Sequence, residues 1–297
     1  MEYEGEIEMK VVWLGQEKHL SPALNHLRFA LARIVDLDAY GDGQEFIAEF
    51  DALKIVEKEK PEAIFIGSNQ YKFVNLDKVT IPKALKLSDP HANFERHCNW
   101  LKKNKVHALP LFGHWVSRYV ERLGEATFFP WCIEHKIYRD YGLQRTIDIS
   151  YTTSPCKILH PIRSAMTETL PKIDDIKSFT SNKQLSREDY IRTIAQSKIF
   201  AFDCSKHHYG MPKFYEGMSC GCAVLADRPA DWELLHFVPN KTFIEITKED
   251  WLETLRYYLA NPYERIKIAE EGHRIFMKYH NADVRAMELV KILEGLM

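Results

Sequence analysis

The stretch that decides the fold reads HHYGMPKFYEGMSCGCAVL, residues 207–225. It opens with a glycine-bearing loop, and Pro212 suits the first position of a helix because its missing N–H is not needed there. Gly221 favours the end of that helix, and the apolar run after it is typical of a buried strand. A loop, a helix and a strand in this order predict one segment of a parallel α/β sheet.

The same alternation runs along the whole chain. The pattern predicts strands at 11–15, 63–66, 84–88, 106–111, 127–130, 147–151, 199–203, 223–226 and 242–246. It predicts helices at 21–34, 46–59, 93–104, 115–123, 160–170, 186–197, 211–220 and 230–236. From Lys248 onward nearly everything is helical, with breaks at Asn261-Pro262 and Asn281-Ala282-Asp283. Two such series in tandem predict two doubly wound α/β domains.

Length and composition set the domain count and broad class. At roughly 150 residues per domain, 297 residues suggest two domains, and we expect them to span 1–145 and 146–297. A formal net charge of −2 excludes a binder of polyanions by bulk charge. No apolar run reaches the ~18–20 residues of a membrane span, and no signal peptide follows the acidic N-terminus. We therefore expect a cytoplasmic protein.

The cysteines do not predict a metal site or a disulfide framework. The six thiols are scattered along the chain, which fits reduced cysteines of the cytosol. A metal cluster is conceivable among Cys204, His207, His208, Cys220 and Cys222, but the paired Cys-x-x-Cys units of zinc sites are absent. The Gly-x-Gly-x-x-Gly fingerprint, the Gly-x-x-x-x-Gly-Lys-Ser/Thr loop and the Gly-x-Ser-x-Gly elbow are absent too, which disfavours dehydrogenases, nucleoside triphosphatases and serine hydrolases.

The helix start at 210–213 is the best candidate for a phosphate site. Ligands of open α/β sheets bind beyond the carboxyl ends of strands, against helix N-termini. There a phosphate meets free N–H groups and the ammonium of Lys213, and Glu216 lies about one turn later, suited to two ribose hydroxyls. The alternative is an ordinary βαβ unit with a solvated lysine and glutamate.

Residues 214–224 resemble a motif of a known family. The run Phe214-Tyr215-Glu216-Gly217-Met218-Ser219-Cys220-Gly221, followed by Val224, is similar to the E-A-M-A-C-G-x-P-V core of GT-B glycosyltransferases of the family 4, or group 1, type. The likeness is greatest to the small spore-maturation-protein-like (CgeB-like) branch, whose pattern is matched in order by Lys213, Glu216, Cys220, Gly221 and Asp227. The resemblance implies two Rossmann-like domains facing a central cleft, with a helical C-terminal tail.

The resemblance also implies a reaction. A nucleotide-diphosphate sugar is held by the C-terminal domain, and an unidentified acceptor (glycan, protein, small molecule or nucleic acid) approaches from the N-terminal domain. Basic side chains and helix amides replace a metal or other cofactor in stabilising the leaving diphosphate. The group favours retention of the sugar's configuration.

Individual roles follow from the resemblance, each with a plainer alternative. The diphosphate is assigned to Lys213 with the backbone of Gly210, Met211 and Pro212, then to Arg163 and Lys157, and the ribose to Glu216. His208 is assigned to the sugar or β-phosphate, Asp89 or His91 to an acceptor base if the reaction inverts, and Gly15 to close approach of a phosphate. The alternatives are solvated lysine and arginine, a loop histidine, a helix cap at Asp89 and a turn glycine.

One departure from the family pattern concerns the donor sugar. Many members carry two glutamates spaced Glu-x7-Glu, and the first of these handles the sugar. Here the position eight residues before Glu216 is His208. Two further functions therefore stand beside the transferase: a catalytically inactive protein that binds nucleotides or glycans, and a nucleotide-sugar epimerase on the same layout.

Overall fold

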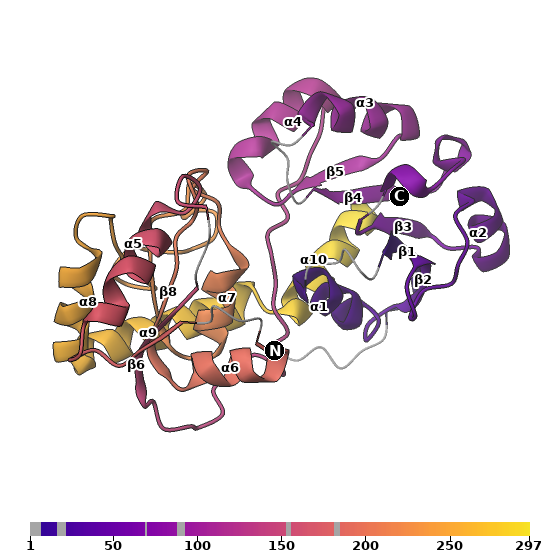
Figure 1. Cartoon of the computed structure of the whole chain (residues 1–297). Coiled ribbons are helices and arrows are strands. Elements are labelled where there is room, and N and C mark those ends of the chain that lie inside the picture. The colour runs from indigo at the N-terminus through magenta and orange to yellow at the C-terminus, as the bar shows by residue number, and fades with distance from the viewer. Residues whose placement is uncertain (1–6, 17–21, 69, 88–92, 153–155, 181–184) are drawn as a thin grey trace. The chain divides into compact units, whose positions relative to one another are not determined.

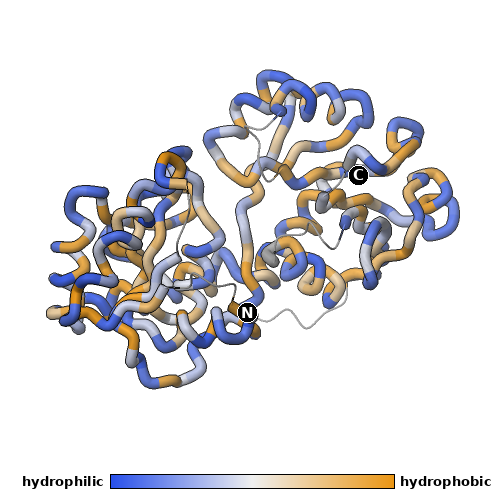
Figure 2. The backbone as a smooth tube through the Cα atoms, viewed as in Figure 1, coloured by the Kyte–Doolittle hydropathy of each residue, from blue (hydrophilic) through white to orange (hydrophobic). Residues whose placement is uncertain are grey.

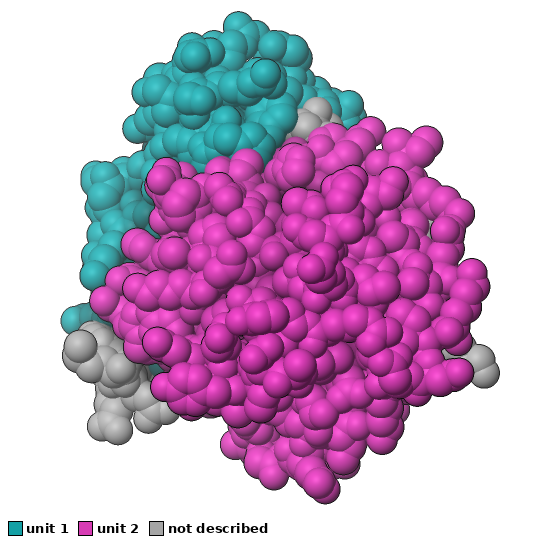
Figure 3. All heavy atoms as spheres, turned by 90° about the vertical axis from the view of Figure 1, so that its left-hand side faces the viewer, with its two compact units in different colours: residues 1–134, 282–297 teal, residues 135–281 magenta. Residues whose placement is uncertain are grey.

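The computed structural model describes residues 7–16, 22–68, 70–87, 93–152, 156–180 and 185–297. The chain forms two compact units (Figure 3): unit 1 comprises residues 1–134 and 282–297, and unit 2 comprises residues 135–281. Each unit is built on one five-stranded sheet. The predicted class, two Rossmann-like parallel sheets followed by C-terminal helices, is confirmed.

Unit 1 holds a parallel sheet of order β2-β1-β3-β4-β5 (Figure 1). The strands are β1 Lys10–Gln16, β2 Asp36–Asp42, β3 Ala63–Ile66, β4 Lys83–Leu87 and β5 His107–Pro110. The helices are α1 Pro22–Leu31, α2 Ala52–Glu59, α3 Phe94–Asn104, α4 Val116–Leu123 and α10 Ala282–Gly295, with short 3-10 turns η2 Gln70–Lys72, η3 Leu76–Lys78 and η4 Gly113–Trp115.

Unit 2 repeats this topology with the order β10-β9-β8-β6-β7. Its strands are β6 Ile147–Tyr151, β7 Ser178–Thr180, β8 Ser197–Ala201, β9 Ala223–Ala226 and β10 Ile244–Glu245. Its helices are α5 Pro161–Thr169, α6 Arg187–Ala195, α7 Pro212–Ser219, α8 Trp251–Ala260 and α9 Pro262–Tyr279, with the 3-10 turn η5 Leu170–Lys172. In both units the first and third strands are neighbours, and there the connections diverge to opposite sides.

Burial explains why the central strands were readable from sequence. Residues 11–14 of β1, 63–66 of β3 and 223–226 of β9 are all at most 1% exposed. A strand covered on both faces of a parallel sheet carries a continuous apolar run, and these runs are largely orange in Figure 2. Each buried run supplies the rigid frame from which a loop leaves at the carboxyl edge.

Two of the edge strands, β2 and β7, were missed because they lack this signal. β2 reads DLDAYGD and is half-exposed over much of its length, and β7 has only three residues. One close approach fixes the position of β2 beside β1. Gly41 lies opposite Gly15 with a φ of +138°, and a Cβ there would lie 1.8 Å from the carbonyl oxygen of Gly15. Only glycine fits this position.

Two predicted elements are wrong. Residues 127–130 are extended but form no strand: Thr127 and Phe129 donate to the carbonyls of Ala108 and Pro110, whereas Pro110 has no N–H to return a bond. Residues 230–236 are a series of turns in place of a helix. His236 adopts a φ of +55°, a left-handed conformation that ends the turns.

The C-terminal helices are present, and the breaks at Asn261-Pro262 and before Ala282 are confirmed. The last helix, α10, is part of unit 1, whereas the residues directly before it are part of unit 2. α10 packs against α1, and the Ala282 N–H donates to the Ile133 carbonyl at 3.0 Å. Unit 1 is therefore discontinuous, which a single boundary at residue 145 does not describe. None of the helices in the described ranges has the length and apolarity to cross a bilayer.

Candidate functional site

The predicted site residues of unit 2 lie at the carboxyl edge of its sheet, where β6 and β8 are neighbours. The chain leaves β6 toward α5 and leaves β8 toward α7, and β7 and β9 lie on opposite sides of this pair. Such a switch point opens a crevice beyond the strand ends, which is where doubly wound sheets bind ligands.

A buried carboxylate organises the β6–β8 side of this edge. Asp203 follows β8 and is 1% exposed. Its Oδ2 accepts the N–H groups of Ile162 and Arg163, both at 3.1 Å, and therefore caps α5. Its Oδ1 lies 2.6 Å from Nδ1 of His160. These first N–H groups of α5 already have an acceptor within the protein, so they are not available to bind a ligand phosphate.

Arg163 is held by the same carboxylate. Its Nε lies 3.0 Å from Oδ1 of Asp203, and its Nη2 donates to the Asp203 carbonyl at 2.9 Å. Burial lowers the pKa of the guanidinium, and the Asp203 charge partly offsets this. Arg163 is therefore held in a buried and fixed position at this edge, with its charge paired to that of Asp203.

His160 is a site residue that sequence reasoning missed. It precedes Pro161 at the start of α5, and the Asp203 carboxylate fixes its ring through Nδ1. Among the described residues nothing hydrogen-bonds Nε2. The signal in the sequence was a histidine in the segment that follows β6, at the predicted switch point. Its partner, Asp203, lies 43 residues further along the chain and could not be inferred from local pattern.

Lys213 is the cation of the site without a partner. It lies in the first turn of α7, and no described residue forms a hydrogen bond or ion pair with its ammonium. Burial lowers the pKa of Lys213, and the positive charge of Arg163 lowers it further. The negative charges of Glu216 and Asp203 partly offset this shift by raising the pKa. Lys213 is half-buried, and an ammonium without a protein partner is available to bind an anion.

Glu216 lies one turn further along α7 and is 8% exposed. Its Oε2 accepts a hydrogen bond of 2.6 Å from the hydroxyl of Tyr190 on α6. Burial, and then the negative charge of Glu216, raises the pKa of Tyr190 well above its ordinary value. Tyr190 therefore remains a donor, and it is a second residue that sequence reasoning did not find.

His208 lies in the loop between β8 and α7, with a left-handed φ of 50°. Its Nδ1 is 3.4 Å from Oδ2 of Asp227, and its side chain is 59% exposed. Asp227 follows β9, and its Oδ1 accepts the Cys204 N–H at 2.6 Å. Burial raises the pKa of Asp227.

No three His, Cys, Asp or Glu side chains in the described ranges are grouped as metal ligands.

Helix α7 begins at Pro212, close to the start predicted from the sequence. Met211 precedes the helix without a side-chain cap, and Pro212 occupies its first turn. Gly210 packs against Leu235, because a Cβ at Gly210 would lie 2.7 Å from a Leu235 methyl carbon. The loop therefore runs close to the 230–236 turns, with the helix start left uncapped by any side chain.

The remaining predicted residues are not brought to this cluster. Lys157 forms an ion pair with Glu168 on α5, and both side chains are more than half exposed. Gly15 lies near the end of β1 in unit 1, and a Cβ at this position would lie 3.0 Å from the Trp13 indole nitrogen. Asp89 and His91 lie outside the described residues.

Residues 163–291 match a family model described as "Glycosyl transferase-like". The fold of the whole chain also recurs in solved structures. The HepE protein of Anabaena, solved in complex with UDP and glucose, superposes with a TM-score of 0.72 at 12% identity, over 97% of this chain and 100% of that one. The chain has the GT-B fold, and residues 163–291 are similar to glycosyltransferases.

Two further solved structures have this fold. Sucrose-phosphate synthase from Thermosynechococcus elongatus superposes with a TM-score of 0.67 at 12% identity, over 97% of this chain and 99% of that one. A UDP-N-acetylglucosamine 2-epimerase superposes with a TM-score of 0.57 at 11% identity, over 96% and 95%. No curated protein matches the sequence. At these identities the superpositions show the fold alone.

Proposed function

We propose that the protein transfers a sugar from a UDP-sugar to an acceptor, with unit 2 holding the donor and unit 1 supplying acceptor groups. The observation that carries this is the position of two side chains on one helix at the switch point: Lys213, a half-buried cation without a partner among the described residues, and the buried carboxylate Glu216. UDP is preferred as the nucleotide because HepE was solved with it. The order of Lys213, Glu216 and Asp227 supports kinship with the spore-maturation-like branch.

In the proposed reaction the bond from the anomeric carbon to the β-phosphate oxygen breaks, and negative charge develops on the leaving diphosphate. Lys213 and the uncapped start of α7 are aimed at this charge. Arg163 also contributes to this stabilisation, because its ion pair with Asp203 holds the guanidinium in a fixed position. These groups supply the charge stabilisation that a metal supplies elsewhere, so we propose that turnover survives EDTA.

Glu216 is proposed to bind the ribose. Its Oε2 is taken by Tyr190, which leaves Oε1 and the second lone pair of Oε2 for the 2′- and 3′-hydroxyls. His160 and His208 lie on the two loops that border the crevice. We propose that Nε2 of His160 and the ring of His208 contact the diphosphate or the transferred sugar.

Calorimetry with UDP tests the donor site. Wild type is expected to bind UDP, Glu216→Gln to bind it more weakly, and Lys213→Met to lose selectivity for UDP over uridine. Lys157→Met is the matched control, since its ammonium pairs with Glu168 at the surface. Equal UDP affinity in wild type, Glu216→Gln and Lys213→Met would overturn the site.

Turnover separates the three functions. A transferase releases UDP from UDP-glucose when an acceptor is present, and the product anomer read by NMR tests the proposed retention. The replacement of the first family glutamate by His208 favours an inactive binding protein, which binds UDP-glucose without releasing UDP. The fold shared with the 2-epimerase favours an enzyme that converts the donor with no acceptor.

A further inference from the structure

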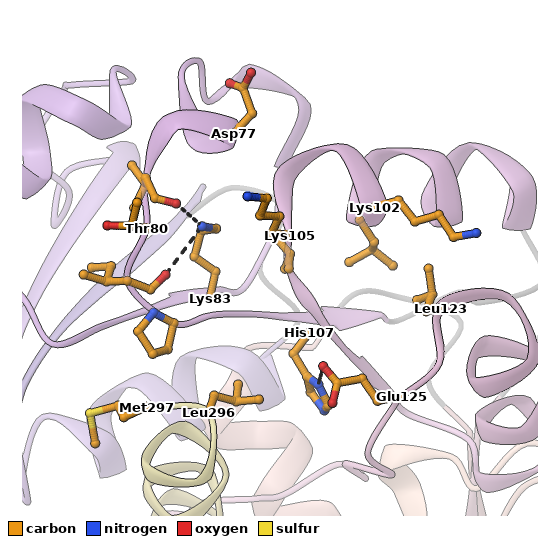
Figure 4. A pocket seen from close by; sticks show the side chains of 15 residues that line it. Asp77, Thr80, Lys83, Lys102, Lys105, His107, Leu123, Glu125, Leu296 and Met297 are labelled. Carbon is orange, nitrogen blue, oxygen red and sulfur yellow. Dashed lines mark hydrogen bonds and ion pairs between the residues drawn. The ribbon is translucent and has the colours of Figure 1, made fainter.

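A second pocket lies in unit 1, at the amino-terminal edge of the sheet, opposite to the edge where Gly15 lies. Its volume is about 640 Å³. The walls come from the loop 79–82, the first residues of β4 and β5, the ends of α3 and α4, and residues 296–297 (Figure 4). Pockets for small molecules span roughly 300–1,000 Å³, so a metabolite fits this space.

The floor of the pocket holds a buried lysine. Lys83 begins β4 and is 3% exposed. Its ammonium donates to the carbonyls of Val79 and Ile81, so backbone oxygens solvate it in place of water. Burial lowers the pKa of Lys83. No described carboxylate forms an ion pair with this ammonium.

A second ammonium approaches from the rim. Lys105 follows α3 with a φ of 51°, and the Lys105 charge is near enough to lower the pKa of Lys83 further. Figure 4 shows the Lys105 side chain pointing toward Lys83, whereas Lys102 extends away from it. Two cations that face one space repel each other unless an anion lies between them.

The acidic side chains around the pocket do not neutralise this pair. Glu125 faces His107, with Oε1 at 3.3 Å from Nδ1. The Asp77 charge raises the pKa of Lys83, but Asp77 forms no ion pair with a described residue. The polar end of the pocket therefore has a surplus of positive charge at Lys83 and Lys105.

The wall also contains polar side chains, among them Thr80 and Glu125. Six apolar side chains line it as well: Val79, Ile81, Leu101, Val106, Leu123 and Leu296. Inorganic phosphate would leave this surface wetted and unused, whereas an organic ligand covers it. The lining therefore suits a molecule with an anionic end and an apolar body.

We propose that this pocket binds an organic phosphate monoester, with its phosphate between Lys83 and Lys105 and its apolar part along the wall. A phosphate dianion matches two separate ammonium groups better than a carboxylate does, because lysine binds phosphate as a point charge. None of the residues that line the pocket is a predicted transfer residue, so the proposal stands independently of the transferase reaction.

Calorimetry of the full chain with phenyl phosphate tests the pocket, with UDP present in excess to fill the donor site. Phenyl phosphate is expected to bind once per chain, more tightly than inorganic phosphate or phenol. Lys105→Asn removes the ammonium and suits the left-handed backbone, and it should weaken binding about tenfold or more. Lys103→Gln on the same helix is the matched control, expected to keep wild-type affinity.

Lys83→Met is the second variant, with its fold checked by circular dichroism, and Lys213→Met repeats the titration without the donor cation. Loss of affinity in Lys83→Met and retention in Lys213→Met support the pocket. Three outcomes overturn the proposal: no binding of phenyl phosphate, unchanged affinity in Lys105→Asn, or equal affinity for inorganic phosphate and phenyl phosphate.

Discussion

The hydroxyl of Tyr190 donates a 2.6 Å hydrogen bond to Oε2 of Glu216, joining α6 to α7 inside unit 2. Glu216 is buried and Tyr190 is half-buried, and the raised pKa of Tyr190 keeps the proton on the phenol. Its geometric effect is to fix one oxygen of the carboxylate that we assign to the ribose. Tyr190 is therefore a positioning residue for Glu216.

Tyr190→Phe should weaken UDP binding by about tenfold, because the Glu216 carboxylate loses its fixed rotamer and a buried acceptor loses its donor. The free energy of unfolding should fall by about 1–3 kcal/mol for the same reason. Calorimetry measures the first and urea denaturation the second.

The matched control is Tyr257→Phe. Tyr257 also donates to a glutamate, Glu264, at 3.0 Å, but on the exposed face of α8. The Tyr257→Phe substitution should leave UDP affinity unchanged. A Tyr190→Phe protein that binds UDP as tightly as wild type would show that Tyr190 only stabilises the fold.

Asp203→Asn should cost about 3–5 kcal/mol of unfolding free energy, because breaking a buried ion pair leaves an uncompensated charge. Here the charge is Arg163, and the cap on α5 weakens at the same time. Urea denaturation measures the loss. Asp175→Asn, which breaks an exposed pair with Arg256, should leave the midpoint unchanged.

The same substitution tests His160. Without the carboxylate at Nδ1, its ring is free to rotate, so UDP affinity should fall in Asp203→Asn beyond the effect of Arg163→Lys. His160→Phe should lower UDP affinity and reduce the free energy of unfolding by about 1–3 kcal/mol, because the buried Oδ1 of Asp203 loses its donor. A protein unaffected in binding by His160→Phe would remove this residue from the site.

The sequence predicted what depends on local pattern and missed what depends on distant partners. The buried strands and α7 were readable because apolar runs and Pro212 act locally. Asp203 was not recognised, because its meaning comes from α5, some 40 residues earlier. Tyr190 looked like one more helical aromatic until α6 packed beside Glu216. The half-exposed β2 has no apolar run to reveal it.

Binding of UDP should weaken with rising pH earlier than an ordinary lysine would allow. Burial lowers the pKa of Lys213, and the diphosphate binds only its protonated form. Affinity is therefore full below the pKa of Lys213 in the free protein and is lost as the pH rises through it. Titrations from pH 7 to 10 measure this loss.

Lys213→Arg should keep UDP affinity nearly constant over this range, since a guanidinium stays charged. Lys213→Met should bind weakly at every pH. The mechanism is contradicted if Lys213→Arg shows the same alkaline loss as wild type, because the titrating group would then lie elsewhere.

Arg145→Lys should destabilise unit 2 and loosen the end of α7. The guanidinium of Arg145 donates through Nη1 to the carbonyls of Ala195 and Ser197, and through Nη2 to those of Cys220 and Gly221, with all four distances between 2.7 and 3.1 Å. It thereby ties the end of α6 and the start of β8 to the turn that ends α7. A lysine ammonium cannot span these four acceptors in one plane.

The expected loss is about 2–4 kcal/mol of unfolding free energy, since hydrogen bonds from charged donors are worth about 1.5–3 kcal/mol each and lysine keeps some of them. Hydrogen exchange should accelerate at Cys220, Gly221 and Cys222, and less at the start of α7, which carries Lys213. Arg139→Lys, whose guanidinium stacks on the exposed Tyr141 ring, is the control and should leave exchange unchanged. Uniform acceleration across unit 2 would mean that Arg145 acts on global stability and not on the α7 turn.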